Sequence, residues 1–139
     1  MKKDAKLTFI SKIMKFLYLD TTTNETAIKV FGDSGKLISV VKWEARFNQS
    51  EELLPAIDKA LDSKIKDLAG IFVNTGYGSY TGVRVGLTTA NFLGLSLNIQ
   101  PVGVNNEKEI VFRKAGVFKQ AVLPQYENEP HITKEKSRR

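Results

Sequence analysis

The feature that most constrains this chain is a glycine-rich turn, residues 76–84, which leads straight into an uncharged segment. No Asp, Glu, Lys or Arg occurs between Val85 and Asn106. A surface helix normally carries a charged stripe opposite its apolar stripe, so a helix at this place must be covered on most of its sides. Small residues recur at every fourth position, which puts them on one ridge where another helix could approach closely: Gly82, Gly86, Ala90 and Gly94. The pattern predicts close packing against a partner.

Length and charge limit the class of protein. With 139 residues, of which 42% are hydrophobic, the chain can build one domain with a proper core. The net charge of +6 gathers at the two ends, because residues 1–15 hold five Lys against Asp4 and residues 131–139 hold four Lys or Arg against Glu135. Such ends are either solvated tails or contacts to the phosphates of a nucleic acid.

Several chemistries lack their essential residues. There is no Cys and one His, His131, so thiolate metal sites, zinc-hydrolase sites and Ser-His-Asp triads are not supported. Lysines interrupt the apolar residues near the N-terminus, and no membrane span is expected. We therefore expect a cytoplasmic protein, for which either Met1 or Met14 is the natural start.

The order of predicted elements indicates the fold. Strands are predicted at residues 16–21, 25–31, 36–43, 69–74 and 101–104, and helices at 50–64 and 80–97, the first with a capping box of Asn48 and Glu51. The order β-β-β-α-β-α-β is that of the ribonuclease-H-like fold, which underlies the actin-like ATPase superfamily. We predict an α/β lobe with a mixed five-stranded sheet over residues 14–104, preceded by a basic N-terminal extension, residues 1–13.

Five residues are candidates for phosphate or nucleotide contacts. Asp20 and Thr22 end the first strand, where this fold places an acidic residue and a phosphate-binding turn. The start of the second helix supplies the others, namely Ser79, Thr81 and Arg84. The alternatives are a polar strand-to-turn cap at Asp20 and a tight strand-to-helix turn at the glycines. The sequence Gly82-Val83-Arg84 is not a Walker motif, which needs a Lys there.

Four segments, in register, resemble one known family. They are Leu17-Tyr-Leu-Asp-Thr-Thr-Thr23, Asn48-Gln-Ser-Glu-Glu-Leu-Leu-Pro55, Gly76-Tyr-Gly-Ser-Tyr-Thr-Gly-Val-Arg84 and Pro101-Val-Gly-Val104. Together they resemble the bacterial TsaB (YeaZ) family of tRNA threonylcarbamoyladenosine biosynthesis proteins. The family pattern has Pro in place of Tyr77 and His in place of Asn48. Most of its second lobe has no counterpart here, so residues 105–139 are predicted to be a vestigial second-lobe segment with a basic tail.

The resemblance implies a non-catalytic subunit without a metal or a required cofactor. It would pair through its two helices with a TsaD-like enzyme, which transfers threonylcarbamoyl to a tRNA adenosine next to the anticodon, and a TsaE-like ATPase would join the assembly. The expected interface residues lie on the two helices: Leu53, Ile57, Gly82, Gly86, Thr89, Ala90, Leu93 and Gly94. ATP or ADP at the partner interface and tRNA at the basic ends are additional possibilities.

Two other functions remain open. One is a reduced actin-like phosphotransferase that binds ATP at Asp20, Thr22 and the turn at residues 76–82. The other is a homodimeric interaction protein that uses the same helices for self-association. The sequence does not choose between pairing with itself and pairing with an enzyme.

Overall fold

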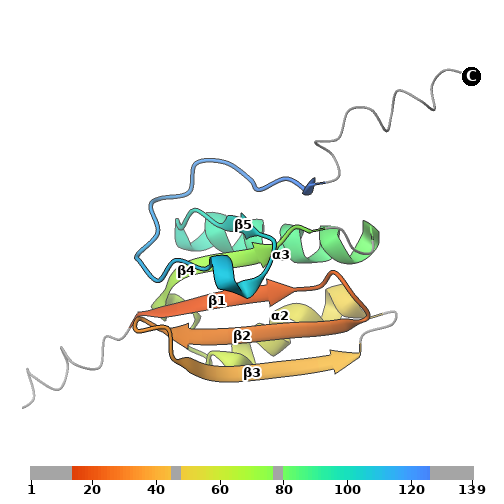
Figure 1. Ribbon diagram of the computed structural model, residues 1–139, viewed down its shortest axis with the longest axis horizontal. Coiled ribbons are helices and arrows are strands. Elements are labelled where there is room, and N and C mark those ends of the chain that lie inside the picture. The colour runs from red at the N-terminus through yellow and green to blue at the C-terminus, as the bar shows by residue number, and fades with distance from the viewer. Residues whose placement is uncertain (1–13, 45–47, 77–79, 126–139) are drawn as a thin grey trace, which may run out of the picture.

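The computed structural model describes residues 14–44, 48–76 and 80–125 of the chain. Within these ranges five strands form one mixed sheet in the order β3-β2-β1-β4-β5 (Figure 1). The strands are β1 (Lys15–Asp20), β2 (Glu25–Gly32), β3 (Leu37–Glu44), β4 (Leu68–Asn74) and β5 (Val102–Val104). The first three are antiparallel, β4 pairs with β1 in parallel, and β5 pairs with β4 in parallel. This is the ribonuclease-H-like α/β lobe that the order of elements predicts.

The central strand β1 is apolar on both faces, because both faces of the sheet are covered there. Leu17 and Leu19 point into one buried cluster, and the alternate residues Phe16 and Tyr18 point into the other. Alternating side chains of a strand lie on opposite faces, so a run with no polar position suits the middle of a covered sheet. By contrast β3 lies at the edge, and its burial alternates between half-buried and exposed residues.

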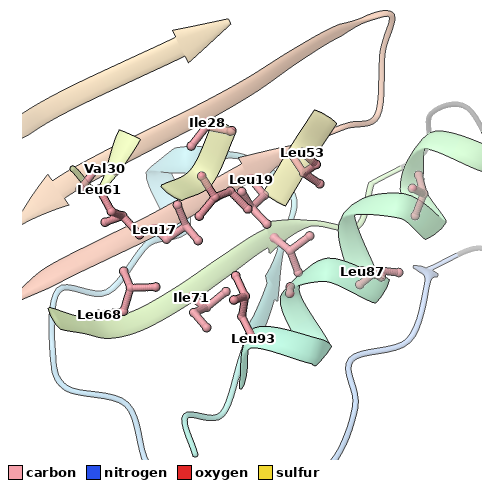
Figure 2. Packing of buried hydrophobic residues seen from close by; sticks show 14 residues of the cluster. Leu17, Leu19, Ile28, Val30, Leu53, Leu61, Leu68, Ile71, Leu87 and Leu93 are labelled. Atoms are coloured by element: carbon pink, nitrogen blue, oxygen red, sulfur yellow. The ribbon is translucent and has the colours of Figure 1, made fainter. Parts of the chain in front are cut away.

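Two helices cover one face of the sheet. They are α2 (Gln49–Ala60) and α3 (Tyr80–Leu97), which in the view of Figure 1 lie behind the strands. Figure 2 shows how their apolar side chains meet those of the strands: Leu53 of α2 and Leu93 of α3 converge with Leu17 and Ile71. Burial of a Leu or Ile side chain contributes about 1.5–3 kcal/mol, so this cluster is the main source of stability.

Both helices end in a left-handed residue that lets the chain turn back toward the sheet. In α3 the residue is Asn98, at φ 58°, and the Ile99 N–H donates to the Gly94 carbonyl at 2.8 Å. In α2 it is Asp62, at φ 53°, followed by a bond from the Ser63 N–H to the Asp58 carbonyl. A second bond accompanies each of these, from the Asn98 N–H to the Leu95 carbonyl at 3.4 Å and from the Asp62 N–H to the Lys59 carbonyl at 3.0 Å. The two bonds together form a Schellman motif, which satisfies carbonyls that the helix itself leaves unpaired.

The other face of the sheet is covered by the chain that follows β5. A short 3-10 turn, η2 (Glu107–Glu109), leads to Ile110, which is buried against the sheet. An extended segment follows, residues 111–125, which we call the strap. Its Phe112 ring packs edge-on against Phe16 and Phe31, with ring centroids 5.5 Å apart in both pairs. The strap then passes around the edge of the lobe toward α3 (Figure 1).

The sequence-based boundaries agree with these elements to within about two residues at each strand. The capping box is wrong, because Asn48 makes no side-chain cap bond; its carbonyl accepts from the N–H groups of Glu51 and Glu52 instead. The basic extension, residues 1–13, and the basic tail lie outside the described residues. A vestigial second lobe at residues 105–139 stays a prediction.

Candidate functional site

A polar cluster occupies the carboxyl ends of β1 and β4. The Asp20 carboxylate accepts from both the N–H and the hydroxyl of Thr22, at 3.0 and 2.6 Å. Its other oxygen lies 3.4 Å from the Asn74 side-chain amide. That amide also contacts the Tyr18 hydroxyl at 3.2 Å and the Asn105 carbonyl at 3.3 Å, while its oxygen accepts from the Gly76 N–H. Asp20 and Asn74 therefore tie three strand ends together.

The cluster borders a polar cleft of about 410 Å³. Lys29 and Glu107 form an ion pair at its wall, and both are partly exposed. Burial, helped by the negative charges of Asp20 and Glu107, raises the pKa of the Tyr18 hydroxyl to about 12. The phenol therefore stays neutral across the physiological range. An Asp that already binds its own turn in this way acts as a strand-to-turn cap.

A buried hydrogen bond links this end of the sheet to α3. The Thr21 hydroxyl donates to the Gly82 carbonyl at 2.5 Å. One turn further along the helix, a Cβ added at Gly86 would lie 2.4 Å from the Thr21 oxygen and 3.4 Å from Val73. The helix can lie this close to β1 and β4 only because position 86 has no side chain.

The ridge of small residues therefore packs within the lobe itself, which corrects the sequence-based prediction that it meets a partner. Gly86 faces the sheet, whereas Gly94 lies against the segment that follows α3, since a Cβ there would lie 2.6 Å from the Ile99 carbonyl oxygen and 2.7 Å from Pro101. Seven of the eight predicted interface residues are buried within the chain: Leu53, Ile57, Gly82, Gly86, Ala90, Leu93 and Gly94. Thr89 alone among the eight is partly exposed. The four-residue spacing of small residues does mark close packing, but the surface that these residues meet belongs to the same chain.

The solvent side of the two helices is unusually apolar. Phe92 is 56% exposed, Leu95 65% and Leu54 38%. Between the helices lies an apolar groove of about 540 Å³, lined by Leu54, Pro55, Asp58, Ile65, Phe92, Leu93, Ser96 and Leu97. We call these groove residues, together with Leu95, the helical face. An exposed apolar patch rimmed by a few polar groups is typical of a protein–protein contact.

The candidate nucleotide contacts do not form one site. Asp20 lines the polar cleft, whereas Thr81 and Arg84 line a separate hollow together with Ser50 of α2. Ser79 lies outside the described residues. Thr22 is nearly buried and bonded to Asp20. In residues 14–44, 48–76 and 80–125, no three acidic or His side chains gather as a metal site would require.

Comparison with known proteins identifies the family. Residues 40–123, more than half of the chain, match the family model described as TsaD, tRNA N6-adenosine threonylcarbamoyltransferase. The chain belongs to this family. Within it the chain is TsaB/YeaZ-like: it is 30% identical, over 114 residues, to the tRNA threonylcarbamoyladenosine biosynthesis protein TsaB of Bacillus subtilis (strain 168). That match takes in 80% of this chain and 49% of the relative.

Solved structures agree on the fold. YeaZ from Pseudomonas aeruginosa superimposes with a TM-score of 0.60 at 22% identity, over 67% of this chain and 44% of that one. A second Pseudomonas aeruginosa structure, described as similar to peptidase YeaZ, gives a TM-score of 0.61 with the same identity and coverage. This TsaB-like chain thus spans about half the length of the relatives it matches. None of the helices in its described part has the length and hydropathy to cross a bilayer.

Apart from Leu93, sequence reasoning missed the residues that form the helical face. Phe92 and Leu95 lie in the uncharged segment but not on the ridge of small residues, so the four-residue spacing does not include them. A helical projection could have found them, because at about 100° per residue Leu95 falls opposite Gly86 and Phe92 about 120° from it, away from the side that carries Gly86, Ala90 and Leu93. No pattern in the sequence indicates the strap.

Proposed function

We propose that this TsaB-like chain is a non-catalytic subunit that binds a TsaD-like enzyme through its helical face. It would thereby support threonylcarbamoyl modification of tRNA adenosine next to the anticodon. The observation that carries the proposal is the apolar groove between α2 and α3 with Phe92 and Leu95 exposed beside it. Family membership supplies the class of partner.

The composition of the helical face suits a stable contact between helices. Its groove is lined almost entirely by apolar groups, with Asp58 and Ser96 as the polar members. Interfaces of this kind bury aromatic and aliphatic anchors at the centre and leave polar groups at the rim. Phe92 would be such an anchor, since its ring is more than half exposed in the isolated chain.

Catalysis is assigned to the partner. Asp20 and Thr22 satisfy each other, and the remaining described nucleotide candidates line another hollow, so an ATP-binding phosphotransferase has less support. In this proposal a TsaE-like ATPase joins the same assembly, the basic ends are available to tRNA, and the work takes place in the cytoplasm. The homodimer alternative uses the same face, so the same substitution at Phe92 serves in the tests of both.

The test compares two Asp substitutions by calorimetric titration with a TsaD-like enzyme. Phe92→Asp should weaken binding at least a hundredfold, because it places an unpaired charge at the centre of an apolar contact. Leu37→Asp, on the edge strand β3, is the matched control, since Leu37 is similarly exposed at 45%. It should leave binding unchanged. Equal effects of the two variants would refute the location of the interface.

Sedimentation of the chain without an enzyme separates the alternatives. A dimer that Phe92→Asp dissociates would assign the helical face to self-association. A monomer that binds the enzyme would support the proposed function. A chain that neither binds the enzyme nor self-associates would contradict both.

A further inference from the structure

The strap is held against the lobe by side-chain amides that bind its main chain. The Asn91 amide on α3 makes two bonds to Val122: its nitrogen donates to the Val122 carbonyl at 3.0 Å, and its oxygen accepts from the Val122 N–H at 2.9 Å. These are the two bonds that a neighbouring β-strand would make to the same residue. Asn91 therefore acts in place of a strand edge.

Gln100 forms a second clamp just after α3. Its side-chain oxygen accepts from the N–H groups of Lys119 and Gln120, at 2.6 and 3.1 Å, and its nitrogen donates to the Gln120 carbonyl at 2.9 Å. Its own N–H donates to the Gly116 carbonyl at 2.9 Å. Asn98 adds a bond from the Phe118 N–H at 3.2 Å. The strap is thus gripped at five residues between 116 and 122 by contacts that do not depend on their side chains.

Side-chain selectivity is confined to a short part of the strap. Val122 packs beside Gly103 of β5, where an added Cβ would lie 3.0 Å from the Val122 methyl and 2.8 Å from Thr75. Two residues later Pro124 is buried, whereas Val117 and Leu123 are exposed. The surface that holds the strap is therefore suited to an extended main chain with one small apolar residue, followed two positions later by a proline.

We propose that Asn91, Asn98, Gln100 and Gly103 form a binding groove for an extended peptide, and that it accepts residues 116–125 of a second copy as well as the chain's own strap. The frame of this groove belongs to elements fixed without the strap. Asn91 lies in α3, Asn98 is the left-handed residue that ends it, and Gly103 lies in a paired strand. The strap has neither helix nor strand of its own between residues 111 and 124. Residues 116–125 can therefore leave while Phe112 stays packed on the sheet, and an identical segment from another copy can make the same bonds.

A peptide of residues 116–125, labelled at its N-terminus, tests the groove in trans by fluorescence anisotropy. The receptor is the full chain with Val122→Asp, which weakens its own strap. Binding should be saturable and at least tenfold tighter than to the unaltered chain, whose tethered strap competes at a high effective concentration. A peptide with the same Val122→Asp change should bind at least tenfold more weakly. Adding Asn91→Leu and Gln100→Leu to the receptor should abolish binding.

Hydrogen exchange provides a second measurement on the full chain without a weakened strap. The amides of Lys119, Gln120 and Val122 should be protected in the unaltered protein. Gln100→Leu should remove protection at Lys119 and Gln120 but leave it at Val122, and Asn91→Leu should do the reverse. The proposal is overturned if the peptide fails to bind a folded Val122→Asp chain, or if the two Leu variants leave the exchange of these amides unchanged. If Val122→Asp does not fold, Val122→Ala replaces it in the receptor, and the same binding outcomes decide.

Discussion

Replacing Gly86 with Ala tests whether α3 is held against the sheet as the structure describes. In a solvent-exposed helix this change would stabilise the fold, because Ala exceeds Gly in helix propensity by roughly 1 kcal/mol. Here the new methyl carbon would lie 2.4 Å from the Thr21 oxygen, a distance that real side chains do not adopt. Either the helix moves away from β1 or Thr21 rotates and loses its bond to the Gly82 carbonyl.

The two costs can be estimated separately. Leaving a buried polar group without its hydrogen bond costs about 1–3 kcal/mol, and overpacking a core by one methyl group costs about 1–3 kcal/mol. If both apply they total about 2–6 kcal/mol, so after the propensity gain of roughly 1 kcal/mol is subtracted, a net loss of about 1–5 kcal/mol in the free energy of unfolding is expected. Unfolding in urea, followed by circular dichroism, measures it as a lower midpoint with an unchanged slope.

Two further variants isolate the cause. Thr88→Ala, on the exposed side of α3, is the control and should change stability by less than about 0.5 kcal/mol. Gly86→Ala should cost less in a Thr21→Ala background, because the oxygen that it meets has been removed; a coupling of about 1 kcal/mol is expected. If Gly86→Ala stabilises the protein, or if its cost is the same in both backgrounds, the close contact between helix and strand is refuted.

The remaining predictions concern other parts of the lobe. The Tyr18 pKa is raised from 10.0 to about 12 in the folded state, so the neutral hydroxyl contributes stability that is fully present below pH 10 and is lost as the pH rises from 10 toward 12. Tyr18→Phe should therefore flatten this alkaline decline in the free energy of unfolding, measured by urea titrations at a series of pH values. Phe112→Ala should destabilise the protein by about 2–3 kcal/mol, which is less than the usual cost for a fully buried Phe because this ring is only half-buried. Thermal unfolding measures the loss, and an unchanged melting temperature would show that Phe112 does not hold the strap on Phe16. Asp62→Gly should stabilise by about 0.5–1 kcal/mol, since it removes a side chain from the left-handed region, and any loss of stability in urea would contradict this account of the α2 end.

The strands could be predicted from the sequence because their patterns have one explanation each. A run such as Phe16 to Leu19 has no polar position and suits a strand covered on both faces, and Glu25 to Phe31 alternates as a half-buried strand does. The order of these patterns along the chain indicated the ribonuclease-H-like fold, and the four motifs added the resemblance to the TsaB family. Fold class and family therefore followed from local pattern and motif spacing together.

The surfaces could not be predicted in the same way, because burial depends on which element lies opposite. The spacing of Gly86 and Ala90 indicates a close approach but does not say whether a helix of a partner or the chain's own sheet approaches. The structure supplies Thr21 and Val73 as the neighbours of Gly86. Likewise Asn91 and Gln100 are ordinary polar residues in the sequence, and only the path of the strap gives them their role.

The position of β1 in the middle of the sheet has a consequence during synthesis of the chain on the ribosome. β1 can pair with β2, and β2 with β3, as soon as this local meander emerges, but the other edge of β1 must wait for β4, which comes only after α2. Parallel pairing between distant segments forms more slowly than a hairpin. Until then the nascent chain carries an open strand edge with apolar residues 16–19 at its centre, of the kind that promotes aggregation, so slow translation between α2 and β4 should increase the demand for chaperones.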